Sequence, residues 1–381
     1  MKKIVILGST GSIGENALNV ARNHADKVRI FGLSTKQNID LLARQVDEFS
    51  PQIVSVWNEE KATELKKRIG SIAEVHCGME GLISLARADA DLVVSALVGS
   101  VGLDPAFEAV KSGTNLALAN KEVLVMAGDL LMAEAMRNRV KIIPVDSEHS
   151  AIMQCLWERR VKEVKRLILT ASGGPFYNKG DIDLSKITPK MALEHPTWKM
   201  GHKVTIDSST LMNKGFEVIE ASCLFGIPID RIDVVIHPES IIHALVEFID
   251  GSVIALMHAP NMCIPIQYAI SWPDRWEGRY GEVSLADIGK MHFFKPDNKR
   301  FPALDLAYHA GSMGGTMPAV LSAADEVCVE KFINGKILYS DIVRIIKNVM
   351  DTHRPITDPT LADILSADKW AREMAEEVIK G

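Results

Sequence analysis

Cysteine is scarce in this chain, and the few cysteines do not cluster. The 381 residues contain five, scattered as Cys77, Cys155, Cys223, Cys263 and Cys328, with no C-x-x-C pair. This spacing indicates neither a zinc cluster nor a disulfide framework. It favours a reducing compartment, and we expect a cytoplasmic protein.

Long apolar runs and an excess of positive charge are also missing. No uninterrupted apolar stretch approaches the ~20 residues of a membrane-spanning helix, so we expect no membrane segment. The first apolar run, after Lys2 and Lys3, is too short for a signal peptide and predicts a strand. The formal net charge of −6 argues against a broad nucleic-acid surface, so any phosphate site should be local.

The chain is too long for one ordinary core, which predicts several domains. Residues 2–150 alternate short β-branched runs with helical patterns, as in a Rossmann-like, doubly wound α/β sheet. The expected parts are a doubly wound domain over 1–149, a mixed α+β domain over 150–276, a connecting arm over 277–300 and a C-terminal helical bundle over 301–381.

The two later domains show their own patterns. RLILTAS and VVIHPES predict strands, and IHALVEFIDGSVIALM predicts two strands joined at Asp250 and Gly251, a common hairpin pair. Apolar stripes at helical spacing over 321–328, 342–350 and 370–378 predict three helices.

A glycine-rich loop follows the first predicted strand. Gly8, Gly11 and Gly14 stand between IVIL and an amphipathic helix, where backbone N–H groups can approach a pyrophosphate. The spacing is G-x-x-G-x-x-G rather than G-x-G-x-x-G, so an ordinary strand–helix turn is the alternative. The second strand run ends in STKQN without a carboxylate for a ribose 2′-hydroxyl, and Lys36 is available for a 2′-phosphate. NADP is therefore favoured over NAD, although a plain exposed lysine is nearly as good an account of Lys36.

Carboxylates mark two further segments. Asp146-Ser147-Glu148 closes the sixth predicted strand, and alternation along a strand directs Asp146 and Glu148 to one side, which suits Mg²⁺ or Mn²⁺. If residues 208–217 open a helix, Asn213 and Glu217 are i, i+4 neighbours beside Lys214, a mixture suited to a sugar phosphate bridged through a metal. A solvated loop and a capped surface helix are the alternatives.

Three short segments have weaker signals. HPTWKMG, from His195, combines turn formers with Trp198 and predicts a closing lid. The turn at Ser172 offers a hydroxyl and N–H donors to a phosphate. Asn120-Lys121-Glu122 follows the strand NLALA at the carboxyl edge. Core anchoring, a simple turn and a plain helix start are the respective alternatives.

Six motifs taken together are more specific than any one of them. LGSTGSIG, LANKE, PVDSEH, TASGGPF, HPTWKMG and DSSTLMNKGFEVIEA occur in order, and the chain resembles the 1-deoxy-D-xylulose 5-phosphate reductoisomerase family from about residue 4 to the C-terminal helices. It departs from the family at Glu239, where Gln is frequent, and over 260–263, where Asp followed by Arg or Lys is frequent. Neither departure falls on a residue assigned below, so they bear on local packing or interface detail.

The resemblance implies a homodimer that converts a sugar phosphate, 1-deoxy-D-xylulose 5-phosphate, into 2-C-methyl-D-erythritol 4-phosphate with NADPH and a divalent cation, Mg²⁺, Mn²⁺ or Co²⁺. The implied NADPH contacts are Thr10, Gly11, Ser12, Ile13, Asn38, Asn120, Glu122 and Gly201. The implied metal ligands are Asp146, Glu148 and Glu217. The implied substrate contacts are Lys121, Ser147, Glu148, Ser172, His195, Trp198, Ser208, Asn213, Lys214 and Glu217. The implied catalytic residues are Lys121, Asp146, Glu148, His195 and Glu217.

Two other readings remain open from the residues alone. One is another NADP-dependent oxidoreductase of similar build, such as a homoserine dehydrogenase-like enzyme. The other is a non-catalytic NADP-binding sensor. Simple hydride transfer needs no three-carboxylate metal site, and a sensor predicts decay of the middle motifs, which are intact.

Overall fold

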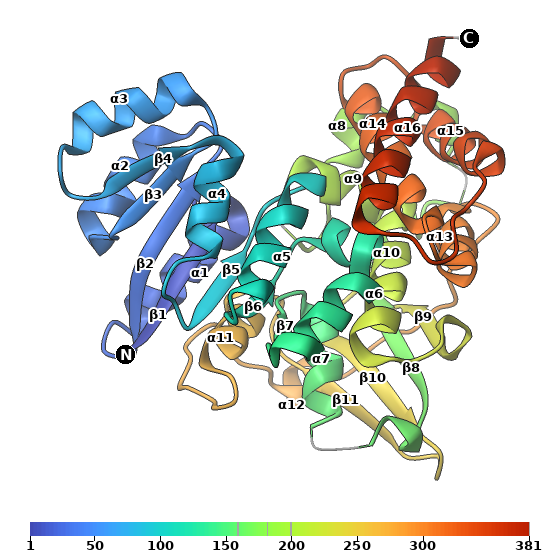
Figure 1. Ribbon diagram of the computed structural model, residues 1–381. Coiled ribbons are helices and arrows are strands. Elements are labelled where there is room, and N and C mark those ends of the chain that lie inside the picture. Colours follow the sequence, from blue (N-terminus) through green and yellow to red (C-terminus); the bar gives the residue numbers. More distant parts are fainter. Residues whose placement is uncertain (158–159, 181, 199, 381) are drawn as a thin grey trace. The chain divides into compact units, whose positions relative to one another are not determined.

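The computed structural model describes residues 1–157, 160–180, 182–198 and 200–380 (Figure 1). The chain divides into two compact units that each collect separate stretches of sequence. Unit 1 comprises Met1–Val123, Asp129–Ser150 and Asn261–Tyr280. Unit 2 comprises Leu124–Gly128, Ala151–Pro260 and Gly281–Gly381.

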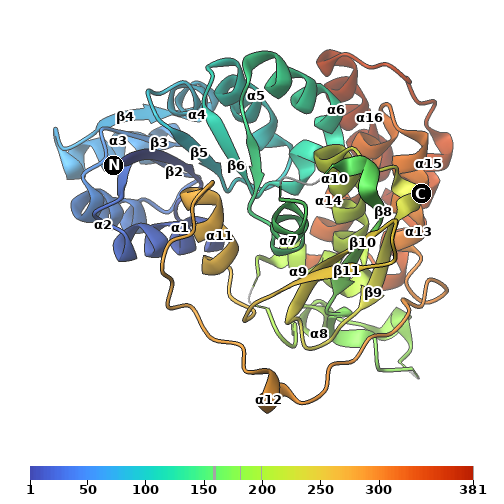
Figure 2. The ribbon, with the colours of Figure 1, turned by 90° about the horizontal axis from the view of Figure 1, so that it is seen from below.

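Unit 1 is built on a seven-stranded sheet whose pairings are parallel (Figure 2). Most of the strands are rich in Val, Ile and Leu, as expected where helices cover both faces of a sheet. In sheet order they are β4 (Glu74–Cys77), β3 (Ile53–Val56), β2 (Val28–Thr35), β1 (Lys2–Leu7), β5 (Leu92–Ser95), β6 (Asn115–Leu118) and β7 (Ile142–Pro144). The predicted doubly wound fold is confirmed.

Helices connect these strands. They are α1 (Ser12–Asn23), α2 (Ile39–Phe49), α3 (Glu59–Ile69), α4 (Gly78–Ala86), α5 (Leu103–Lys111), α6 (Lys121–Asn138) and α7 (Ser147–Cys155). The strand order reverses between β1 and β5, which is the point where open α/β sheets place their ligands.

Strand β4 has no counterpart among the predicted strands. Its sequence EVHC is half polar, and it lies at the sheet edge with Glu74 and Cys77 exposed. A search for apolar runs therefore does not detect β4. Because of this additional strand, the Asp146 segment follows the seventh strand rather than the sixth.

Residues 261–280 pack with unit 1, although the sequence places most of them in the predicted α+β domain. Helix α11 (Cys263–Ser271) contacts α1, and His24 Nε2 lies 2.8 Å from Gln267 Oε1. The predicted domains are consecutive segments of sequence, so they cannot represent a later stretch that packs with an earlier domain. The boundaries of the four predicted parts remain a prediction, and the packing itself defines two units.

Unit 2 contains a four-stranded mixed sheet in the order β11-β10-β8-β9. Strand β8 (Val164–Ala171) pairs in parallel with β9 (Ile232–Ile236) and antiparallel with β10 (Ile242–Phe248). Strands β10 and β11 (Val253–Met257) form the predicted hairpin. Its turn has Gly251 at φ +86°, and Asp250 Oδ1 accepts a hydrogen bond from Ser252 N at 2.9 Å.

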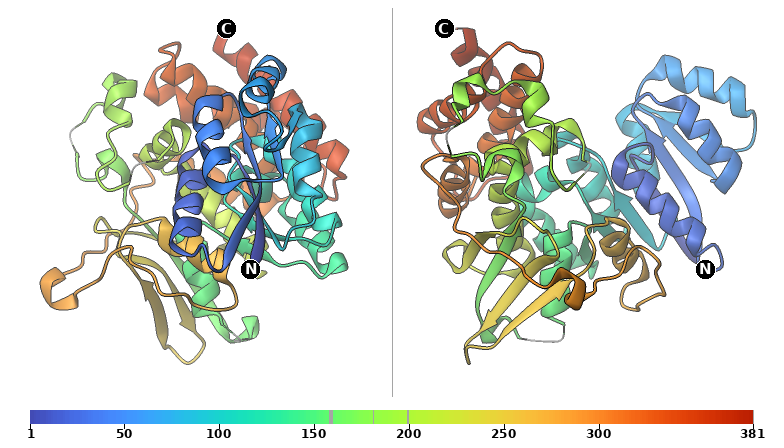
Figure 3. Two further views of the ribbon diagram at one scale, coloured as in Figure 1. Left: turned by 90° about the vertical axis from the view of Figure 1, so that its left-hand side faces the viewer. Right: turned by 180° about the vertical axis from the view of Figure 1, so that it is seen from behind.

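Helices share one apolar core with this sheet. They are α8 (Pro189–Ala192), α9 (His202–Thr210), α10 (Met212–Phe225), α13 (Ala303–Met313), α14 (Met317–Ile333), α15 (Tyr339–Thr352) and α16 (Leu361–Lys380). Figure 3 shows the C-terminal helices, in orange and red, gathered into a bundle. The three predicted apolar stripes lie on α14, α15 and α16, the first two buried and the third half-buried.

The predicted arm contains only one short helix, α12 (Leu285–Ile288). Further along it, Phe294 exchanges two backbone hydrogen bonds with Ile236, of 2.8 and 2.9 Å, at the end of β9. Among the described residues no helix combines the length and the apolarity needed to cross a membrane.

Candidate active site

The glycine loop of unit 1 is sterically specified at two of its three glycines. Gly8 has φ +87°, and a Cβ there would lie 2.6 Å from Ala96 O. A Cβ on Gly14 would lie 2.3 Å from Gly8 O, because α1 starts directly against the end of β1. At Gly11 the nearest atom would be 3.5 Å away. The loop thus has the tight turn and the close helix packing that a dinucleotide loop requires.

The end of strand β2 holds this loop in place. Ser34 Oγ accepts a hydrogen bond from Gly8 N at 2.9 Å, and the hydroxyls of Thr10 and Thr35 lie 2.6 Å apart. Asn38 caps α2, since its Oδ1 accepts from Leu41 N at 3.2 Å. Lys36 is exposed beside it. Ser12 and Ile13 open α1, whose first turn directs its N–H groups outward.

Asn120, Lys121 and Glu122 stand at the start of α6, at the carboxyl edge of the same sheet. Asn120 Nδ2 donates to Gly99 O at 3.3 Å and to the Glu122 carboxylate. Asn120 and Glu122 are both buried, while the Lys121 ammonium contacts the Asp146 carboxylate. The segment therefore carries a hydrogen-bonded amide and an ammonium paired with a predicted metal ligand.

The strand geometry predicted for Asp146 and Glu148 is wrong, because Asp146 directly precedes α7 and Glu148 lies in its first turn. Strand β7 ends at Pro144 and α7 begins at Ser147, so strand alternation does not apply. Instead Asp146 Oδ1 accepts from Glu148 N at 3.1 Å, and the Ser147 hydroxyl donates to the Glu148 carboxylate at 2.5 Å. The turn into the helix fixes the two carboxylates.

His149 is a contact that the sequence reading missed. Its Nδ1 lies 3.1 Å from Asp146 Oδ1, and the side chain is fully buried. The i, i+3 spacing from Asp146 to His149 on a helix start was the available signal. We infer that the imidazole orients the Asp146 carboxylate, as outer partners of metal ligands commonly do.

In unit 2, Ser172 and His195 are joined by a hydrogen bond. Ser172 Oγ lies 2.9 Å from His195 Nε2, and His195 Nδ1 accepts from the backbone N–H groups of Thr197 at 3.1 Å and Trp198 at 2.8 Å. Because Nδ1 is an acceptor, the proton sits on Nε2 and donates to Ser172. Burial lowers the pKa of His195 to about 4, so the imidazole is neutral at neutral pH.

Trp198 lies against a pair of histidines. Its ring is edge-on to His243 with centroids 6.2 Å apart, and His243 stacks on His258 at 3.6 Å. His243 and His258 are buried, in keeping with structural histidines. The next residue of the lid segment, Lys199, lies outside the described residues.

The junction of α9 and α10 brings the other unit 2 residues together. Leu211 adopts φ +65° between the helices, an uncommon conformation for a branched side chain. At the end of α9 lies Ser208, whose carbonyl oxygen would be 2.7 Å from a Cβ on Gly174. The Ser172 turn, with Gly173 and Gly174 at positive φ, therefore packs directly on α9.

The first turns of α10 carry the polar group that the sequence predicts. Asn213 Nδ2 donates to Glu217 Oε1 at 2.6 Å, and the Lys214 ammonium contacts the same carboxylate. Glu217 is 1% exposed. Within the part of the chain that the structure describes, the buried Oδ1 of Asn213 has no hydrogen-bond partner, which leaves it available to a ligand.

The structure thus separates the predicted residues into two groups. Unit 1 holds Thr10, Gly11, Ser12, Ile13, Asn38, Asn120, Lys121, Glu122, Asp146, Ser147 and Glu148. Unit 2 holds Ser172, His195, Trp198, Gly201, Ser208, Asn213, Lys214 and Glu217. Gly201 is the one predicted NADPH contact in unit 2, where it caps the start of α9.

A doubly wound sheet with a steric glycine loop, together with a second unit rich in hydroxyls and buried charge, defines a two-unit oxidoreductase of the NAD(P)-dependent class. Three family models match the chain: 1-deoxy-D-xylulose 5-phosphate reductoisomerase over residues 4–128, the C-terminal domain of that enzyme over 142–225, and the DXP reductoisomerase C-terminal domain over 257–374. The chain belongs to the 1-deoxy-D-xylulose 5-phosphate reductoisomerase family.

Individual relatives agree over the full length. The 1-deoxy-D-xylulose 5-phosphate reductoisomerases of Caldanaerobacter subterraneus and Thermodesulfovibrio yellowstonii are 52% and 49% identical, with 98% and 100% of this chain and of each relative covered. The Zymomonas mobilis enzyme solved with NADPH has a TM-score of 0.93 at 36% identity, covering 100% of this chain and 99% of its own. A reductoisomerase solved with NADPH, fosmidomycin and magnesium has a TM-score of 0.96 at 37% identity, covering 100% and 98%. The predicted resemblance is confirmed.

Proposed function

We propose that this chain isomerises and reduces 1-deoxy-D-xylulose 5-phosphate to 2-C-methyl-D-erythritol 4-phosphate, with NADPH and a divalent cation, for isoprenoid precursor synthesis. The observation that carries the proposal is the match to this family along nearly the whole chain. The resemblance implies that Asp146, Glu148 and Glu217 are the oxygen ligands of one cation. Hydride transfer alone would need no such set.

The donors fit a hard cation. All three are carboxylates, with no sulfur or imidazole ligand among them, which suits Mg²⁺ or Mn²⁺, with Co²⁺ as a further candidate. Each already has a contact of its own, Asp146 with His149, Glu148 with Ser147 and Glu217 with Asn213. We assign all three as metal ligands.

The nucleotide loop fits NADPH. Backbone takes the space that a Cβ would fill at Gly8 and Gly14, so these two positions exclude a side chain. Gly8, Ser9 and Gly11 donate their N–H groups within the chain, and we assign the N–H groups at the start of α1 to the pyrophosphate. We assign Thr10, Gly11, Ser12 and Ile13 to the pyrophosphate end and Lys36 to the 2′-phosphate. Asn38, Asn120, Glu122 and Gly201 complete the NADPH contacts that the family resemblance implies.

The substrate's phosphate is assigned to the end of α9. Ser172 and Ser208 offer hydroxyls from adjoining segments. Asn213 Oδ1, which has no hydrogen-bond partner among the described residues, adds a polar atom at the start of α10. His195 presents a neutral imidazole that already donates to Ser172, so it orients that hydroxyl without adding charge. Trp198 closes the site as a lid, and Ser147 contributes a further hydroxyl.

The chain's own residues then divide the chemistry. When bound, a divalent cation held by the proposed ligands would polarise oxygens of the substrate, and NADPH would supply the hydride. Lys121 pairs with Asp146 and Lys214 pairs with Glu217, so each ammonium stands beside a proposed ligand, where negative charge develops on the substrate oxygens. Lid closure excludes water while that charge exists.

We further propose that the enzyme is a cytoplasmic homodimer. The family resemblance implies the dimer, and five free thiols in the described chain suit a reducing compartment. Light scattering coupled to size-exclusion chromatography checks the assembly. A mass near 41.9 kDa would contradict the dimer, and about twice that mass would support it.

The reaction is tested by incubating the protein with NADPH, Mn²⁺ and 1-deoxy-D-xylulose 5-phosphate while following nicotinamide absorbance. We expect loss of absorbance that depends on the substrate and stops when a chelator removes Mn²⁺. Absorbance that stays constant with all three present would reject the proposed function.

A further inference from the structure

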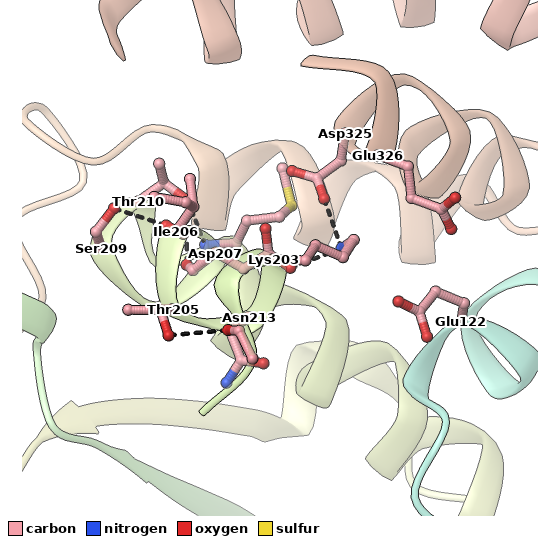
Figure 4. Close-up of polar contacts among 12 residues, drawn as sticks. Glu122, Lys203, Thr205, Ile206, Asp207, Ser209, Thr210, Asn213, Asp325 and Glu326 are labelled. Carbon is pink, nitrogen blue, oxygen red and sulfur yellow. Dashed lines mark hydrogen bonds and ion pairs between the residues drawn. The ribbon is translucent and has the colours of Figure 1, made fainter. Parts of the chain in front are cut away.

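Helix α9 carries a partly buried lysine between two carboxylates, drawn in Figure 4. Lys203 Nζ lies 2.6 Å from Asp207 Oδ2 and 2.8 Å from Asp325 Oδ2. The three side chains are 14%, 3% and 1% exposed. None of them belongs to the sites assigned above.

The two ion pairs differ in what they join. Lys203 and Asp207 are i, i+4 neighbours within α9. Asp325 comes from α14, 122 positions away in the sequence. The second pair is therefore a cross-link between the helix that carries Ser208 and the C-terminal helical bundle.

Helix α9 connects the predicted lid segment to Ser208 in unit 2. It begins directly after Gly201, where the lid segment ends, and Asp207 immediately precedes Ser208. The end of α9 is also tied to the bundle, because Tyr339 Oη of α15 donates to Ser209 O at 2.7 Å. Two buried polar contacts thus fix the helix, one near each end.

The buried cross-link should matter more than the ion pairs on the bundle surface. An exposed pair contributes about 0 to 1 kcal/mol, whereas loss of one partner from a buried pair leaves a desolvated charge. The pair between Lys331 of α14 and Glu376 of α16 has side chains 26% and 38% exposed. The Lys203 to Asp325 pair is more buried, with side chains 14% and 1% exposed, and it joins α9 to α14.

We propose that Asp325 is a positioning residue for the reaction: its ion pair with Lys203 holds α9 so that Ser208 meets the phosphate of the substrate. The inference rests on the proposed function and deepens it, because it assigns part of phosphate recognition to a C-terminal helix. Asp325 acts through Lys203 and touches neither substrate nor cofactor.

The test is Asp325→Asn, which keeps the shape of the side chain and leaves the Lys203 to Asp207 pair inside α9. A displaced Ser208 weakens phosphate binding, so we expect KM for 1-deoxy-D-xylulose 5-phosphate to rise about ten-fold or more while kcat falls by less. The Kd for NADPH, measured by fluorescence titration, should stay within about two-fold, because the glycine loop belongs to unit 1. A second variant, Lys203→Arg in the otherwise unchanged protein, keeps both ion pairs possible and should retain most of the wild-type substrate affinity.

Asp368→Asn is the matched control. Asp368 is also buried and accepts two hydrogen bonds from Arg372, but its pair lies within α16. Both variants are assayed well below their measured Tm, so that folded protein is compared. KM unchanged in Asp325→Asn, or raised equally in Asp368→Asn, would overturn the positioning role.

The wild-type protein separates this inference from the proposed function. Turnover by the wild type together with a normal KM in Asp325→Asn rejects the positioning role alone. If the wild type does not turn over 1-deoxy-D-xylulose 5-phosphate, the proposed function fails and the positioning role falls with it.

Discussion

The glycine loop of unit 1 and the α9–α10 junction of unit 2 are held in shape by different kinds of contact. The loop is specified by backbone: Gly8 and Gly14 are excluded from bearing a side chain by atoms 2.6 and 2.3 Å from the place of a Cβ. The junction is specified by side chains, with a buried Glu217 held by Asn213 and Lys214. Substitutions in the loop should therefore act through shape, and substitutions at the junction through charge.

This contrast suits the two tasks proposed for these regions, nucleotide binding by the loop and substrate binding at the junction. A nucleotide pyrophosphate is the same in every cycle and needs only N–H groups and space. The substrate changes its charge distribution during the reaction, so its site needs ionisable groups held at fixed positions. Variants test this contrast. It would be wrong if a substitution at the junction weakened NADPH binding as much as it slowed turnover.

The largest effect is expected at Glu217. Glu217→Gln removes a proposed ligand charge and leaves Lys214 without its carboxylate, so turnover should fall on the order of a thousand-fold. NADPH affinity, measured by fluorescence titration, should change little. Glu376→Gln, which removes a half-exposed carboxylate from α16, should keep full turnover. Near-normal turnover in Glu217→Gln would remove this residue from the metal site.

A purely steric effect is expected at Gly14. Gly14→Ala places a methyl group against backbone atoms of Gly8 and Ser9, which cannot move aside as a side chain could. We expect a loss of about 1 to 3 kcal/mol in the free energy of unfolding and a marked loss of NADPH affinity. Gly11→Ala, with 3.5 Å of clearance, should fold normally. Equal stability of the two variants in urea titrations would contradict the steric account.

The smallest effect is expected from the acid dependence of His195. Burial lowers the pKa of His195 from 6.5 to about 4, so between these values the unfolded chain binds a proton that the folded chain does not. The free energy of unfolding should therefore fall as pH drops from 6.5 towards 4 and become insensitive to His195 below that. In His195→Gln this decline should be shallower. Parallel curves for the two proteins in urea titrations from pH 7 to pH 4 would show that His195 is not desolvated.

The sequence predicts the fold where the signal is local. A few consecutive residues suffice to predict the hairpin at Asp250-Gly251 and the apolar strands β1, β2, β3, β5 and β6. Strand β4 does not, because its pairing with β3 compensates for a half-polar sequence at the sheet edge. The return of residues 261–280 to unit 1 depends on packing between α11 and α1, which no local pattern encodes.

The candidate site divides in the same way. The i, i+4 spacing of Asn213 and Glu217 predicts their contact, because helix geometry alone decides it. Strand alternation does not place Asp146 and Glu148 on one side, because the strand stops at Pro144. Ser147 and Glu148, which mark the start of a helix, were the signal against a strand here. The left-handed Leu211 and the partner of Lys203 on α14 have no local signal, because distant packing imposes both.

The most direct test of the account is a crystal structure with Mn²⁺, in which anomalous scattering locates the ion independently of the protein atoms. We predict one ion with an oxygen of Asp146, of Glu148 and of Glu217 at about 2.0 to 2.6 Å. An ion bound elsewhere, or held by Asp146 and Glu148 with Glu217 out of reach, would contradict the assignment of a three-carboxylate site.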